Sequence, residues 1–143
     1  MKNVLDTSAL SAAMRGDPAL LAWLREREPS ELATVPPAVA EIHYGIERLD
    51  PASRKCRVLR DEWARWAPML RVLPWSPAAS ERFGRIKATL ERVGTRIEDM
   101  DIAIAAIASA HDCRVLTANL KHFRRIPDIE CGSWLNSSGK ALS

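Results

Sequence analysis

The sequence lacks several features that would assign it to common protein classes. Its 143 residues contain no apolar run approaching the length of a membrane span, and no apolar leader precedes the first predicted strand. It has only three cysteines, Cys56, Cys113 and Cys131, and their odd number and spacing fit neither a disulfide framework nor a zinc site. We therefore expect reduced, packed cysteines and a cytoplasmic protein that makes no contact with membranes.

Glycine and histidine are also scarce, with six and three residues respectively. The sequence has no Walker A loop, no glycine-rich dinucleotide fingerprint and no zinc-ligand spacing among its histidines. A phosphatase with an aspartyl nucleophile typically has a second aspartate two residues after the first, but that position here is Ser8. These absences argue against a P-loop nucleotide-binding protein, a dinucleotide-binding enzyme, a zinc protein and an aspartyl phosphatase.

What is present is typical of one globular domain. Net charge is +3 and the pI is about 9.0, a mildly basic balance that is compatible with a nucleic-acid substrate. Short apolar strands alternate with amphipathic helices, which predicts an α/β fold: a three-layer α/β/α sandwich around a parallel sheet of four to five short strands. We expect one domain over residues 1–135 and a flexible tail over 136–143. The predicted strands are 2–5, 32–35, 71–73, 114–117 and 129–131, and the predicted longer helices are 36–49, 52–67, 77–93 and 99–112.

Three acidic residues occupy positions that suggest a site assembled by folding. Asp6 follows the first strand, where ligands bind in α/β folds, although it is also a suitable cap for the next helix. Ser8 is an alternative N-cap for that helix. Glu41 lies on the flank of an apolar helix stripe and is half buried in this interpretation, unless it is a solvated charge. Asp101 opens an alanine-rich helix that we expect to be buried on most sides.

Converging carboxylates repel each other and lose hydration, so they require a cation. Asn119 ends the fourth strand and is either a simple turn residue or an oxygen ligand. Hard ions such as Mg²⁺ and Mn²⁺ prefer oxygen ligands, and Mg²⁺ usually keeps several waters. The residues therefore favour a divalent ion that also contacts a substrate phosphate.

Four segments together resemble the PIN-domain ribonucleases, and in particular the toxin subunits of VapBC-type toxin–antitoxin pairs. They are Val4–Ser8, Ala40–Ile46, Asp101–Ala108 and Thr117–Phe123, in the expected order and spacing. Each motif alone is weak, but the resemblance extends over nearly the whole chain. It implies a PIN-like fold and endonucleolytic cleavage of RNA that depends on Mg²⁺ or Mn²⁺, with metal-activated water as the nucleophile.

The resemblance also assigns roles to individual residues. The three acids of the family pattern correspond to Asp6, Glu41 and Asp101, and Asp6 and Asp101 are expected to bind the metal ion. Many members have a fourth acid after the fourth strand, where this chain has Asn119, which we include among the catalytic candidates. His122 stands where an aspartate often precedes the phenylalanine. Because the fourth acid is missing from its usual places, one tightly held ion is expected.

Further residues are predicted to support this centre. Thr7, Thr117 and Asp99 are candidates for a shell around the metal ligands, and Asp99 is also the rival of Asp101 for the ligand role. Many arginines and lysines lie on outer faces, either as ordinary solvated residues or as a track for a phosphate backbone. The residues predicted to contact substrate are Arg96, Lys121 and His122.

The helix at 52–67 has two interpretations. Leu59, Trp63 and Trp66 are either plain core residues or part of an apolar groove against the helix at 36–49. The resemblance implies that such a groove clasps a VapB-type antitoxin segment, and it also implies a homodimer and a heterotetramer or larger assembly with the antitoxin. Two alternatives remain open: a catalytically silent PIN-like module that binds RNA or protein, and a PIN nuclease of RNA processing without an antitoxin.

Overall fold

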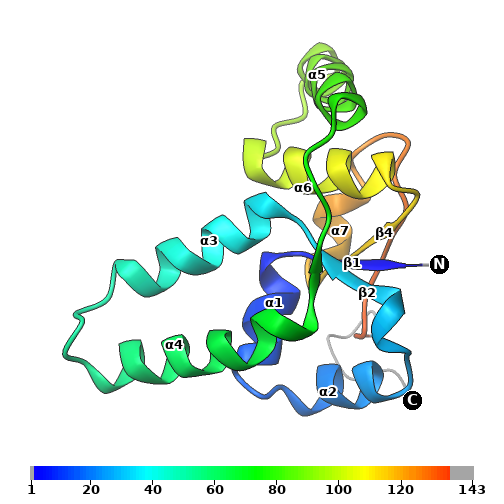
Figure 1. Ribbon diagram of the computed structural model, residues 1–143. Coiled ribbons are helices and arrows are strands. Elements are labelled where there is room, and N and C mark those ends of the chain that lie inside the picture. The colour runs from blue at the N-terminus through cyan, green and yellow to red at the C-terminus, as the bar shows by residue number, and fades with distance from the viewer. Residues whose placement is uncertain (1, 136–143) are drawn as a thin grey trace.

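Five short strands form one parallel sheet at the centre of the computed structural model, which describes residues 2–135 (Figure 1). The strand order is β3-β2-β1-β4-β5, so β1 is central and pairs with β2 and β4. The predicted tail at 136–143 lies outside the described residues, as does Met1. The strands are β1 (Asn3–Leu5), β2 (Leu32–Thr34), β3 (Arg71–Val72), β4 (Arg114–Leu116) and β5 (Cys131–Gly132).

The described residues contain seven α-helices. Figure 1 shows α5 and α6 on one side of the sheet and α1, α2 and α4 on the other, which confirms the predicted three-layer α/β/α arrangement. The helices are α1 (Thr7–Met14), α2 (Pro18–Arg25), α3 (Pro36–Glu47), α4 (Arg54–Trp66), α5 (Pro77–Arg92), α6 (Asp99–Ala110) and α7 (Leu120–Phe123). Two 3₁₀ turns, η1 (Pro29–Glu31) and η2 (Ala67–Met69), precede β2 and β3.

The alanine-rich helix α6 is buried as expected. Every residue from 102 to 108 is at most 2% exposed, and the helix packs against α5 and β4. Small alanine side chains allow this close approach, and the apolar surface removed from water stabilises the position of the whole helix. The first turn of α6 is therefore held firmly at the edge of the sheet.

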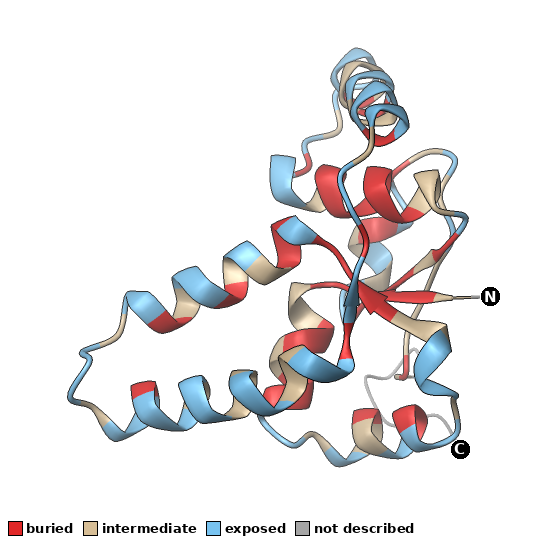
Figure 2. Ribbon diagram, in the orientation of Figure 1, coloured by how far each residue is buried: buried red, intermediate tan, exposed pale blue. Residues whose placement is uncertain are grey.

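Helices α3 and α4 extend away from the sheet as a pair (Figure 1). Cys56 is the buried residue of α4, and most of that helix is exposed (Figure 2). Cys56, Cys113 and Cys131 are free thiols in the structure, and the first two are buried. No helix within residues 2–135 combines the length and the apolar character needed to cross a bilayer.

Several predicted boundaries differ from the structure. Helix α1 begins at Thr7 and is capped by Asp6, so the prediction that Ser8 is its cap was wrong. The fifth strand lies at 131–132 and overlaps the predicted segment only at Cys131. The four-residue helix α7, which opens at Leu120, was not predicted, because it is too short to show helical periodicity.

Candidate active site

The carboxyl ends of β1 and β4 place two polar segments next to each other. These strands are parallel neighbours, and the Asp6 amide donates to the Leu116 carbonyl over 3.2 Å. Asp6 follows β1 and Thr117 follows β4, so both side chains lie at the same edge of the sheet. This is the edge at which parallel α/β sheets bind ligands.

Asp6 is buried, with only 3% of its surface exposed. Its Oδ1 atom accepts a hydrogen bond from the Ala9 amide at 2.8 Å and another from the Ser8 hydroxyl at 2.6 Å. Capping of α1 is therefore a real role of Asp6. The hydroxyl of Ser8 also accepts from the Ala118 amide at 2.9 Å, so it links α1 to the segment after β4.

The pKa of Asp6 is raised above its ordinary value. Burial is the main cause, because it penalises the charged carboxylate, and the negative charge of Asp101 acts in the same direction. Hydrogen bonds from Ser8, Thr117 and Ala9 oppose the shift without cancelling it. A cation beside Asp6 would relieve both unfavourable effects.

Asp101 lies in the first turn of α6, and 27% of its side chain is exposed. Its Oδ2 atom lies 3.0 Å from His122 Nε2, and His122 Nδ1 lies 2.8 Å from a guanidinium nitrogen of Arg125. Asp101 opens onto a cavity of about 620 Å³ that Asn119, Lys121, His122 and Arg125 also line. The structure therefore brings three predicted substrate or catalytic residues into one cavity with this carboxylate.

Glu41 is half buried in α3, as its place beside the buried Ile42 predicts. Its Oε1 atom accepts a hydrogen bond from the Thr7 hydroxyl at 2.5 Å. Because Thr7 directly follows Asp6, this bond ties Glu41 to the start of α1. Thr7, which the sequence predicts in a shell around the metal ligands, therefore donates its hydroxyl hydrogen bond to Glu41.

Thr117 is fully buried, and its hydroxyl lies 3.4 Å from that of Ser8. It also accepts a hydrogen bond from the Asn119 amide at 2.9 Å. Asn119 itself is exposed and precedes α7. Its amide side chain makes no capping bond to α7, so it is available to water or substrate in the cavity.

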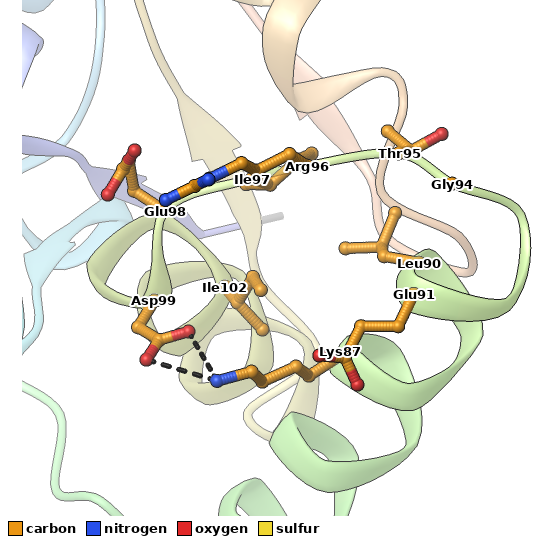
Figure 3. Close-up of a pocket in the computed structure, with 10 residues that line it drawn as sticks. All are labelled: Lys87, Leu90, Glu91, Gly94, Thr95, Arg96, Ile97, Glu98, Asp99 and Ile102. Carbon is orange, nitrogen blue, oxygen red and sulfur yellow. Dashed lines mark hydrogen bonds and ion pairs between the residues drawn. The ribbon is translucent and has the colours of Figure 1, made fainter.

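Asp99 and Arg96 lie around a different cavity, between the end of α5 and the start of α6 (Figure 3). The Lys87 ammonium contacts both carboxylate oxygens of Asp99, at 3.0 and 3.2 Å. Figure 3 shows the Arg96 guanidinium directed toward Glu98. The structure does not bring Asp99 and Arg96 into the cavity of Asp101, and their predicted roles stay predictions.

The predicted partner groove involves three half-buried residues. Leu59, Trp63 and Trp66 pack against the core while keeping part of their surface exposed. The Trp63 ring meets the His43 ring edge to face, with centroids 5.9 Å apart. The buried part of these side chains fits the core interpretation, and the exposed part is compatible with a groove. A role in binding a partner stays a prediction.

The donor set suits a hard divalent ion that retains water. Within residues 2–135, no three side chains of His, Cys, Asp or Glu form a ready-made metal cluster. Asp6 and Asp101 nevertheless supply two interacting carboxylates, and one of them is buried with a raised pKa. Two carboxylates plus waters are an ordinary environment for Mg²⁺, so the residues fit the ion that the sequence predicts.

Two residues of the site were not assigned from the sequence. Ser8 was interpreted only as a helix cap, and its bond to Asp6 depends on the backbone geometry of the strand–helix turn. Arg125 was grouped with the general surface cations. Its i, i+3 spacing from His122 was the available signal, but it is informative only if a helical turn forms there.

The chain is similar to known proteins over most of its length. Residues 4–129 match the model of the PIN domain. The chain is 27% identical over 135 residues to ribonuclease VapC2 of Haemophilus influenzae, which covers 94% of this chain and 99% of the relative. It is 30% identical over 137 residues to the tRNA(fMet)-specific endonuclease VapC of Salmonella typhimurium, which covers 94% and 98%.

Solved structures share the fold of this chain. A complex of VapBC2 from Rickettsia felis with a promoter DNA fragment superposes with a TM-score of 0.83 at 23% identity and covers 94% of this chain and 99% of the other. DNA-bound VapBC from Salmonella typhimurium superposes with a TM-score of 0.82 at 26% identity and covers 94% and 98%.

Proposed function

The chain belongs to the PIN domain family, among its VapC-type ribonucleases, and we therefore propose that it is a Mg²⁺- or Mn²⁺-dependent endoribonuclease. We further propose that it acts in the cytoplasm as the toxin of a type II toxin–antitoxin pair. The observation that supports this most strongly is the buried Asp6, whose charged form is disfavoured by burial and by the neighbouring charge of Asp101. A cation beside such a pair favours the charged form of both carboxylates at neutral pH.

When bound, a divalent ion would neutralise charge on the phosphodiester and lower the pKa of a coordinated water. Asp6 and Asp101 would hold the ion. The Ala9 amide and the Ser8 hydroxyl hold one oxygen of Asp6 in place. The Asp6 carboxylate therefore needs little reorganisation during the reaction. Glu41, fixed by Thr7, retains partial exposure and can accept a proton or a hydrogen bond from water at the same rim.

The residues along the Asp101 cavity suit an RNA backbone. Lys121 is exposed there and can contact a phosphate, and the Asn119 amide can donate or accept hydrogen bonds. Attack of water on phosphorus with loss of the 3′ oxygen would leave a 5′-phosphate and a 3′-hydroxyl. The scissile RNA strand would then lie across the ends of β1 and β4.

The solved relatives are VapBC complexes, which supports a VapB-type antitoxin as the partner of this chain. We place its docking site in the groove of Leu59, Trp63 and Trp66, where half-buried apolar surface lies on the projecting helix pair. A homodimer, assembled with antitoxin into a heterotetramer or larger particle, is the corresponding assembly. Suppression of toxicity by the product of an adjacent reading frame would separate this role from that of an RNA-processing nuclease.

The direct test is cleavage of cellular RNA by the purified chain with Mn²⁺, followed by sequencing of the new ends. We expect discrete cuts with 5′-phosphates, and a loss of roughly 100-fold or more in rate for Asp6→Asn, because a metal ion contributes several kcal/mol to such reactions. Asp17→Asn is a matched control, since Asp17 caps α2 away from the site. RNA binding without any cleavage would instead identify a silent binding module.

A further inference from the structure

Three side chains form a continuous line of hydrogen bonds beside the proposed metal site. Asp101 Oδ2 lies 3.0 Å from His122 Nε2, and His122 Nδ1 lies 2.8 Å from the Arg125 guanidinium. The three residues come from α6, α7 and the turn after α7, and all line the same cavity. They are therefore joined across separate elements rather than within one helix.

The chemistry of arginine determines the direction of these bonds. A guanidinium has only donors, so His122 Nδ1 must accept. The ring proton then lies on Nε2, which donates to Asp101 Oδ2. The contact with Arg125 thereby selects the one neutral tautomer of His122 that can hold the carboxylate.

The imidazole ring is fixed by its surroundings. His122 meets the ring of Phe123 edge to face, with centroids 5.8 Å apart, and Phe123 is only 1% exposed. The Arg125 amide donates to the His122 carbonyl at 3.2 Å, which continues the turn and places both side chains on one face. A buried anchor and a backbone turn thus hold the donor that reaches Asp101.

The second oxygen of Asp101, Oδ1, receives no hydrogen bond from residues 2–135. We propose that Arg125 and His122 are positioning residues that hold Oδ2 of Asp101 and leave Oδ1 as the single oxygen for the metal ion. This inference rests on the proposed function, in which Asp101 is a metal ligand. It gives His122 a role different from the substrate contact that the sequence predicts.

Calorimetric titration of the full chain with Mn²⁺ measures the metal affinity and tests this role without measuring activity. Loss of an outer partner of a metal ligand typically lowers metal affinity by about 10- to 100-fold, and we expect this loss for His122→Ala. His122→Gln should restore most of the affinity, because its amide nitrogen can donate from the place of Nε2. Arg125→Gln should also weaken binding. Arg124→Gln removes the same charge one residue away, outside the cavity, and should bind Mn²⁺ as the unmodified chain does.

Imidazole ¹⁵N NMR of the metal-free chain tests the tautomer itself. We expect a protonated Nε2 and an unprotonated Nδ1 for His122, and a mixture of tautomers in Arg125→Gln. A proton on Nδ1 in the unmodified chain would overturn the inference.

Asp101→Asn separates the proposed metal site from the positioning role of His122. If it leaves the Mn²⁺ affinity unchanged, the proposed metal site is wrong. If it weakens binding while His122→Ala binds Mn²⁺ normally, the metal site stands and only the positioning role fails.

Discussion

Asp6 combines two roles that its position in the sequence presents as alternatives. It caps α1 through the Ala9 amide, and it lies buried at the end of the central strand β1. A cap alone would be satisfied at the surface, where the carboxylate keeps its hydration. Burial beside Asp101 has a free-energy cost that the cap does not explain, which is why we assign Asp6 to a metal site.

This cost predicts how Asp6→Asn changes stability. The pKa of Asp6 is higher in the folded chain than in the unfolded chain, so protonation of Asp6 stabilises the folded state. This stabilisation is complete below the pKa of the unfolded chain, and it is lost as pH rises through the pKa of the folded chain. Without metal, Asp6→Asn should therefore be more stable than the unmodified chain at pH 7, and the difference should shrink toward pH 4. Urea unfolding of both chains in EDTA, at pH 7 and at pH 4, measures this difference in the free energy of unfolding.

Asp6→Ala is the matched comparison, because asparagine caps helices as well as aspartate and alanine does not. We expect Asp6→Ala to be about 1 kcal/mol less stable than Asp6→Asn. A stability difference between Asp6→Asn and the unmodified chain that is independent of pH would contradict the assigned pKa shift.

Individual residues of the site were predictable to different degrees. Asp6, Glu41 and Asp101 stand out as candidates in the sequence because a carboxylate is unusual at a strand end or within an apolar helix. The bonds of Ser8 to Asp6 and of Arg125 to His122 were not, because they depend on the path of short turns. Neither turn has a repeating pattern in the sequence.

At the scale of elements, α6 determines where Asp101 lies. Its buried alanines let the helix approach the sheet and α5 closely, which fixes the first turn at the rim. The sequence predicted this helix well because its apolar run is long. Short elements such as α7 and β5 were missed or misplaced, since two to four residues show no periodicity.

The close packing of α6 predicts a large effect of added volume. Ala105 is fully buried, so Ala105→Leu should lower the free energy of unfolding by roughly 1–3 kcal/mol through overpacking. Met100→Ala, on an exposed part of the same helix, should change it by less than about 0.5 kcal/mol. Chemical denaturation of both variants measures these changes in the free energy of unfolding. Equally small changes in the two variants would show that α6 is loosely packed.

At the scale of the whole molecule, sheet topology brings the site together. Asp6 and Asp101 are far apart in sequence, but β1 and β4 are neighbours and α6 leads directly into β4. The alternation of strands and helices predicted a parallel sheet and hence a common rim. The sequence could not place Asp99 and Arg96 at a separate cavity, because that depends on how α5 packs against α6.

The function proposed for this chain requires one divalent ion held by Asp6 and Asp101. Crystals of the full chain grown with Mn²⁺ test it directly, by anomalous diffraction from the metal. We predict one peak per chain within bonding distance, about 2.0–2.3 Å, of an oxygen from each carboxylate. No peak at this position, or a peak only elsewhere on the chain, would contradict a metal site between Asp6 and Asp101.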